Sequence, residues 1–340
     1  MNIEDRPGGG VAASPSRRAM LRGLTRTAAA IGAAGILVRG AWAQGGKPVR
    51  IILPVSAGSG ADGVARVMSN GLAKALDHPT VIENLPGAGG ITGTTQIVRG
   101  AKDGSVIGFV SNNHVVNPSV YKNVPFDAIE DITPITVIGA TPFVLVAHPG
   151  LAAKNVRELV ALAKAQPGAL NYGSSGNGTI LHLAAELFCS EAQVDIKHIP
   201  YRGMGPLTAD VLGGQVQLAV IAVAVAAPLV KAGSLRAIGV TSTARSPLLP
   251  DVPTIAEQGL PNYAIDGWVA VIGPAGIAKA EVQRINAAVK STVELPEVRE
   301  SLLAQGYVLK VNSPEEAGAF FRSEATRMAT LVRQANVKID

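Results

Sequence analysis

Four loops of this chain combine glycine with small or polar side chains, and each leads from an expected strand into an expected helix: residues 54–62, 84–90, 173–179 and 200–206. Glycine lets the backbone come close to a bound molecule. The first N–H groups of a helix have no partner inside the helix, and they lie at the positive end of its dipole. Such groups attract anions. Four loops of this kind predict a cleft that binds a carboxylate.

The candidate ligand-binding residues come from these loops and from one polar strand end. Backbone amides and hydroxyls are expected to hold the carboxylate. Asp62 is expected to orient water or to accept a hydrogen bond from a hydroxyl or amine of the ligand, and Tyr201 to pack against the ligand body. The whole set is Ser56, Ser59, Gly60, Asp62, Asn112, Ser174, Ser175, Gly178, Thr179, Tyr201 and Arg202.

The first loop also matches a dinucleotide-binding fingerprint, Gly58-x-Gly60-x-x-Gly63, with Glu83 after the next expected strand. This alternative is disfavoured because Asp62 would place a carboxylate at the helix N-terminus, where a pyrophosphate would have to lie. The histidines are scattered, and there is a single cysteine, so the spacing of a metal site is missing. The sequence therefore predicts neither a cofactor nor a metal.

A hydrolase is a second alternative, since Ser175 could act as a nucleophile and His182 as its base. The GxSxG pattern fails because position 177 is Asn, and Cys189 follows apolar residues instead of basic ones. Two alternatives stay open: an exported enzyme that uses Ser175 or Cys189, and an exported ligand sensor for a membrane kinase. The main prediction is a binding protein without catalytic residues.

The N-terminal residues carry the signature of an export signal. Arg17 and Arg18 precede an apolar run over residues 28–38, and Ala41-Trp42-Ala43 ends on the small-x-small spacing of a cleavage site. We expect residues 1–43 to be a twin-arginine-type signal peptide that is cleaved on export to a Gram-negative-type periplasm. Without this segment the formal charge of +5 falls to about +1, which argues against a nucleic-acid partner.

Short β-branched runs alternate with helical patterns along the rest of the chain. This alternation predicts an α/β fold with crossover connections and mainly parallel sheets. The strand–loop–helix pattern with a glycine-rich loop occurs near residues 53–62 and again near 172–179, which favours two doubly wound lobes facing one cleft. We expect residues 44–144 plus 268–340 to form one lobe and residues 145–267 the other, joined by a hinge of two crossovers.

Seven motifs follow one another along nearly the whole chain. They are Gly58-x-Gly60-x-Asp62 with Ala65-Arg66, Glu83-Asn84-x-Pro86-Gly87-Ala88-Gly89-Gly90, Pro167-Gly168-x-Leu170-Asn171-Tyr172, Gly176-x-Gly178-Thr179 with His182, Pro200-Tyr201-Arg202-Gly203, Leu212-Gly213-Gly214-Gln215 and Leu249-Pro250-Asp251-Val252-Pro253-Thr254. In these motifs the chain resembles the Bug family, the substrate-binding proteins of tripartite tricarboxylate transporters.

The resemblance implies a bilobal, type II-like periplasmic binding protein that closes on a small carboxylate. The implied ligands are di- and tricarboxylates, amino acids or aromatic acids, held by backbone amides, hydroxyls and water. The implied partners are the integral-membrane subunits of the transporter, to which the ligand is delivered. We expect the protein itself to be a monomer.

Overall fold

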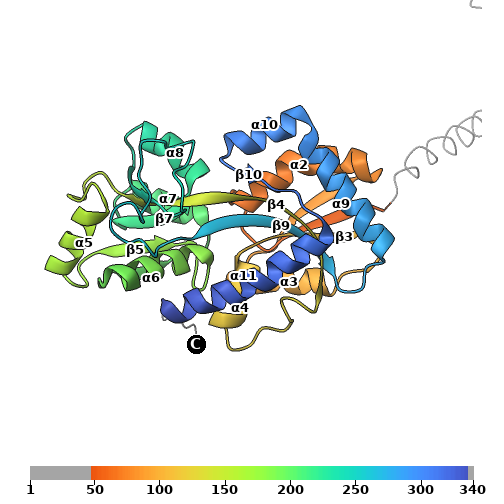
Figure 1. Cartoon of the computed structure of the whole chain (residues 1–340), viewed down its shortest axis with the longest axis horizontal. Helices are drawn as coiled ribbons and strands as arrows, with labels where there is room; N and C mark the ends of the chain where they lie inside the picture. The colour runs from red at the N-terminus through yellow and green to blue at the C-terminus, as the bar shows by residue number, and fades with distance from the viewer. Residues whose placement is uncertain (1–46, 336–340) are drawn as a thin grey trace, which may run out of the picture. The chain divides into compact units, whose positions relative to one another are not determined.

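The structure is a computed structural model that describes residues 47–335 (Figure 1). The predicted signal peptide, residues 1–43, lies outside the described residues. The strands are β1 (Val49–Leu53), β2 (Thr80–Asn84), β3 (Val106–Ser111), β4 (Ile132–Ala147), β5 (Asn171–Ser174), β6 (Lys197–Pro200), β7 (Leu218–Ala222), β8 (Arg236–Val240), β9 (Asp266–Pro274) and β10 (Val308–Leu309). The helices are α2 (Gly60–Leu76), η1 (Ala88–Gly90, a 3-10 turn), α3 (Ile91–Val98), α4 (Asn113–Val120), α5 (Val156–Ala165), α6 (Ile180–Ala192), α7 (Met204–Leu212), α8 (Val223–Lys231), α9 (Lys279–Glu294), α10 (Pro296–Ala304) and α11 (Pro314–Gln334).

The strands follow the order β2-β1-β3-β9-β4-β7-β5-β6, and β8 and β10 also pair with β4. Pairing is parallel between β1 and its neighbours β2 and β3, and between β5 and its neighbours β6 and β7. It is antiparallel wherever β4 or β9 takes part. The expected parallel pairing is therefore found in the outer strands, whereas the centre of the sheet is antiparallel.

The long strand β4 connects two groups of strands. Its residues 132–142 pair with β9, and its residues 143–147 pair with β7. Figure 1 shows β4 and β9 running between β3 on one side and β5 and β7 on the other. In the sequence of β4 only residues 144–147 have an uninterrupted strand pattern, because two prolines and a glycine interrupt the first part. Register shifts within that first part accommodate them.

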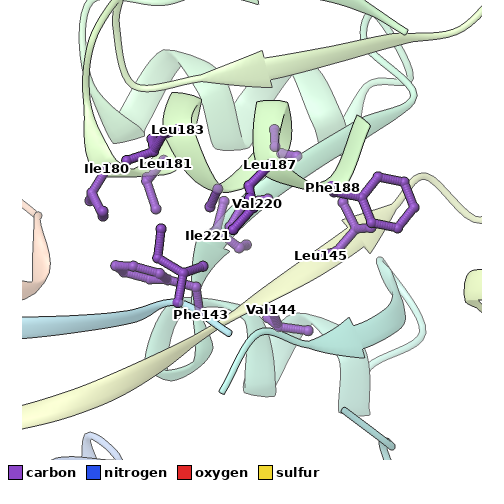
Figure 2. Packing of buried hydrophobic residues seen from close by; sticks show 14 of the residues in the cluster. Phe143, Val144, Leu145, Ile180, Leu181, Leu183, Leu187, Phe188, Val220 and Ile221 are labelled. Carbon is purple, nitrogen blue, oxygen red and sulfur yellow. The ribbon is translucent and has the colours of Figure 1, made fainter. Parts of the chain in front are cut away.

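Two buried hydrophobic clusters hold the helices against the sheet. One contains residues of β1, β3 and β9 together with α2, α9 and α10. The other contains residues of β4 and β7 together with α6 and α11. In Figure 2 the side chains of α6 between Ile180 and Phe188 lie near Phe143 and Leu145 of β4 and Val220 of β7. This packing fixes the position of α6 and of the loop that precedes it.

Helices α2 and α6 begin in the same way. Their N-cap residues, Ser59 and Thr179, have extended backbones with φ −75°, ψ 164° and φ −73°, ψ 159°. The Ser59 hydroxyl accepts from the N–H of Asp62, and the Thr179 hydroxyl accepts from the N–H of His182. A cap of this kind stabilises a helix start by about 1 kcal/mol. It satisfies one N–H group and leaves others of the first turn for a ligand.

Candidate ligand-binding site

A cavity of about 510 Å³, the main cavity, lies where the four glycine-rich loops meet. Its walls come from the loops after β1, β2, β5 and β6 and from the region of α4. The predicted residues that line it are Ser56, Ser59, Ser175, Thr179, Tyr201 and Arg202. Segments far apart in the sequence therefore build one site.

Asp62 braces the first of these loops from inside. Asp62 is buried, with an exposed fraction of 3%. The carboxylate accepts from the Gly58 N–H, from Arg66 Nε and from Asn84 Nδ2 at 2.9, 2.9 and 3.0 Å. Burial acts to raise the pKa of Asp62, but these hydrogen bonds outweigh it and hold the pKa below its usual value. Asp62 thus shapes the loop, which differs from the expected contact with water or ligand.

The loop after β5 turns through two glycines and ends at Thr179. Gly176 and Gly178 have φ values of +140° and +70°, which other residues rarely adopt. The Thr179 hydroxyl donates to the Gly176 carbonyl at 2.9 Å. The Ser175 hydroxyl donates to the Thr179 hydroxyl at 3.3 Å. The N–H of Gly178 donates to His182 Nδ1 at 3.1 Å. The amide of Gly178 is therefore engaged, whereas Ser175 and Thr179 line the cavity.

Three stacked rings support this loop from beneath. The ring centroids of His182 and His198 are 3.9 Å apart, and those of His198 and Tyr172 are 5.0 Å apart. Burial lowers the pKa of His182 to about 3 and the pKa of His198 to about 4. His198 Nε2 lies 2.6 Å from the Ser174 hydroxyl, and the Tyr172 hydroxyl donates to Glu186. Both imidazoles are therefore neutral near pH 7.

Two side chains from the α4 region reach the loop after β5. Asn113 Oδ1 accepts from the Ile180 N–H at 2.7 Å. The Tyr121 hydroxyl donates to the Asn177 carbonyl at 2.9 Å. Because both residues also line the main cavity, these bonds join its two sides.

The loop after β6 contributes a ring and a cation. The Tyr201 hydroxyl donates to Asp210 at 2.7 Å, and burial together with this bond raises the pKa of Tyr201 to about 12. Arg202 is exposed at the cavity wall, and its side chain pairs with no carboxylate in the described part of the chain. Its guanidinium is available to an anionic ligand.

A smaller cavity of about 100 Å³ adjoins the main one. The two cavities share five lining residues, which we call the junction: Val55, Ser59, Asn113, Ser175 and Met204. Gly60, predicted to touch the ligand, lines the smaller cavity. The N-terminal ends of α2 and α6 therefore meet at the junction.

Sequence comparison assigns the family. The sequence model described as "Tripartite tricarboxylate transporter family receptor" matches residues 64–337. The chain belongs to this family. The Protein BugT of Bordetella pertussis is 32% identical to this receptor over 295 residues, which cover 86% of this chain and 90% of BugT.

Solved structures agree with the family. Rpa4515 of R. palustris, described with adipate, has a TM-score of 0.82 and 28% identity, covering 88% of the receptor and 100% of that chain. MatC of Rhodopseudomonas palustris, with bound malate, has a TM-score of 0.79 and 26% identity, and the match covers 84% of this chain and 98% of MatC. The predicted resemblance to Bug proteins and the bilobal periplasmic binding fold are confirmed. No helix within residues 47–335 is long and apolar enough to cross a membrane.

Three residues of the predicted set already have hydrogen-bond partners within the protein, which makes them positioning residues for the loops. Asn112 is 0% exposed and reaches only the smaller cavity; its amide donates to the Asp266 carbonyl and accepts from the Trp268 N–H. Ser174 is also 0% exposed and bonds to the backbone of Gly176 as well as to His198. The N–H of Gly178 donates to His182 Nδ1. All three hold the loops in place because their polar groups already have partners.

Two residues that line the main cavity and bond across it, Asn113 and Tyr121, are absent from the predicted set. Asn113 follows Asn112 directly, and the polar end of β3 was the signal that could have found it. The sequence does not show which of two adjacent amides faces the cleft, because that depends on where the strand ends and α4 begins. Tyr121 follows α4 and carries no signal of its own.

The groups that the hydrolase and dinucleotide-binding alternatives require are engaged in hydrogen bonds or are unreactive. The Ser175 hydroxyl donates to Thr179 and not to His182. Burial raises the pKa of the Cys189 thiol to about 12, so the thiol is protonated near pH 7. Glu83, the acidic residue of the dinucleotide fingerprint, accepts two hydrogen bonds of 2.7 Å from Arg50. In the described part of the receptor, no group of three or more His, Cys, Asp or Glu could hold a metal ion.

Proposed function

We propose that this receptor is exported, captures a small carboxylate in the main cavity, and presents it to integral-membrane transporter subunits. The carrying observation is that two hydroxyl-capped helix starts, those of α2 and α6, line a cavity that also exposes the guanidinium of Arg202, which pairs with no carboxylate of residues 47–335. Both helix dipoles and the guanidinium favour an anion. None of the residues lining the main cavity is acidic. The nearby carboxylate of Asp62 is engaged by Gly58, Arg66 and Asn84.

In this proposal the carboxylate lies at the junction. Gly60 and Ala61 are the first residues of α2, ahead of the capped N–H of Asp62, and their N–H groups have no intrahelical partner. Ser175 lines the same space from the other side, and Thr179 lines the main cavity beside it. A carboxylate that accepts hydrogen bonds from the start of α2 and lies against the loop before α6 is held without a buried cation.

The remaining predicted contacts surround the rest of the ligand. Ser56, Tyr201 and Arg202 line the main cavity beyond the junction. The adipate and malate of the two relatives are small carboxylates, which supports the same class here. The transporter partner is inferred from the name of the family.

We also propose that the two lobes have the boundaries expected from the sequence, and that ligand binding closes them. In support, β4 changes its pairing partner at Phe143 and β9 begins at Asp266, close to the two expected crossovers. The hydrogen bonds of Asn113 and Tyr121 to the loop after β5 would then join the lobes in the closed state.

Export to the periplasm by the twin-arginine route, with cleavage after residue 43, completes the proposal. It is supported by the paired arginines, the apolar run and the Ala-x-Ala end of the N-terminal segment. The expected monomer is part of the same proposal.

The double substitution Ser175→Ala with Thr179→Ala tests the site. It removes two hydroxyls from the cavity wall, so affinity for the preferred carboxylate should fall about tenfold or more. Isothermal titration calorimetry of the full chain with malate, adipate, citrate, glutamate and benzoate measures this. Circular dichroism checks that both forms are folded.

Ser190→Ala is the matched control. It lies on α6 too, but its hydroxyl bonds to the Gln334 carbonyl, away from the cavity. It should leave affinity unchanged. Equal affinity in the double variant would refute the site, and an unaltered chain that binds no carboxylate after ligand removal by unfolding and refolding would refute the function.

A further inference from the structure

The smaller cavity, called here the inner compartment, differs from the main cavity in chemistry. None of its lining residues is charged. Its apolar wall is built mainly from the crossing strands and from helices α6 and α8, by Phe143, Trp268, Val269, Ile180, Leu181 and Val225. Burying a charge without a partner is strongly unfavourable. A second carboxylate of the ligand would therefore avoid this space.

We propose that the inner compartment binds an uncharged aliphatic arm of the ligand, while every charged group of the ligand stays at the junction and in the main cavity. The inference rests on the proposed function, because the carboxylate at the junction sets where the arm begins. The two cavities share their junction residues, so one ligand can occupy both. The shape of the site thus separates charged from apolar parts of the ligand.

Its volume limits the arm to a short one. About 100 Å³ is less than the ~150 Å³ cavity known to admit benzene, so an aliphatic group fits better than a phenyl ring. Among the polar residues on the wall, Thr141 has a buried hydroxyl without a partner among the described residues. It could pair with a neutral hydroxyl of the arm, but it cannot balance a carboxylate.

Trp268 gives this compartment a spectroscopic reporter. Its indole N–H donates to Glu324 at 2.9 Å, and its ring packs edge-on against Phe320 and Phe321. The indole is therefore fixed against α11, and Trp268 is one of the residues that line the compartment. Trp42 is the only other tryptophan of the chain, and Trp42→Phe leaves Trp268 as the single emitter.

The first experiment is a chain-length series on the full chain carrying Trp42→Phe. Linear monocarboxylates from acetate to hexanoate are titrated by calorimetry and by tryptophan emission. Each methylene that enters the compartment should strengthen binding about fourfold, until the space is full. The emission of Trp268 should shift to the blue over the same steps. Succinate, glutarate and adipate should lack this gain, because their second charge stays outside.

The second experiment fills the compartment. Val225→Phe adds a ring to its wall, and the ratio of the valerate to the acetate affinity should fall to about one. Val230→Phe is the matched control, the same change on the same helix at a residue that lines neither cavity. It should keep the gain with chain length. Ala222→Val repeats the test with less added volume.

The outcomes separate the two proposals. A chain that binds acetate and succinate but shows a flat series would overturn the inner compartment and leave the proposed function intact. The same holds if Val225→Phe weakens all acids equally or leaves the gain in place. A chain that binds no carboxylate at all would overturn both.

Discussion

The loops before α2 and α6 present similar helix starts to one site, but they are supported in opposite ways. The loop before α2 is braced by the charge of Asp62, which is held by Arg66 and Asn84. Arg66 is half exposed, so this support is in contact with solvent. The loop before α6 is braced by the neutral rings of His182, which is buried, and His198, which is half-buried.

This difference predicts different sensitivities for the two halves of the site. A charged brace near the surface depends on the ionisation of a carboxylate with a low pKa, and it is partly screened by salt. A neutral stack depends on packing and on histidines that stay unprotonated. The same anion-binding geometry can therefore fail on one side while the other side stays intact.

The largest effect is expected from His182→Ala. The substitution removes a packed ring and leaves the Gly178 N–H without its partner, so unfolding free energy should fall by about 3 kcal/mol. Carboxylate affinity should fall as well, because the loop of Ser175 and Thr179 loses its support. Urea unfolding and calorimetry measure the two effects.

His148→Ala is the matched control for this substitution. His148 Nδ1 also accepts from a backbone N–H, that of Gly150 at 3.1 Å, but it belongs to no ring stack. Its loss should cost less than about 1 kcal/mol. Equal costs for the two histidines would show that the stack contributes nothing special.

Asp62→Ala should cost somewhat less than His182→Ala. Three donors lose their acceptor, but Arg66 can turn to solvent, so we expect a loss of about 2 kcal/mol in unfolding free energy. Asp103→Ala is its control, since that exposed carboxylate accepts only from Ser105. Denaturant melts compare the two, and a smaller loss for Asp62 than for Asp103 would contradict the bracing role.

The helix starts could be predicted from the sequence because capping is local. Ser59 and Thr179 stand directly before helical patterns, and their chemistry follows from the N–H groups three residues later. The alternation of elements likewise predicted the α/β class. His182, a candidate base in the hydrolase alternative, instead accepts from the Gly178 N–H and packs beneath its loop.

The fine assignment of contacts could not be predicted, because it depends on partners distant in sequence. Asn112 is engaged by β9, more than 150 positions away, and Ser174 by His198 of β6. The first part of β4 was missed because its prolines are tolerated only through register shifts against β9. In each case, tertiary pairing decides between neighbouring residues or strands, and the sequence alone does not.

Lowering the pH should destabilise the loop before α6 before it affects the loop before α2. The folded-state pKa values of His182 and His198, about 3 and about 4, lie below the ordinary value of 6.5. The unfolded chain therefore binds more protons, and the stability that these rings contribute is complete above pH 6.5 and is lost as the pH falls towards 4. The lowered pKa of Asp62 has its effect only below its ordinary value of 3.8. Between these limits only the loop before α6 loses support.

Unfolding free energies at several pH values between about 7 and 5 measure this. Below pH 6.5, each of the two histidines can lower the unfolding free energy by up to about 1.4 kcal/mol per pH unit. His182→Ala removes one of these two groups, so the unfolding free energy should change less steeply with pH. Asp62→Ala should keep the slope of the unaltered chain, since its carboxylate does not titrate in this range. If Asp62→Ala flattened the slope and His182→Ala did not, the supports would be assigned to the wrong loops, because only a group that changes protonation between the folded and unfolded states can produce a slope.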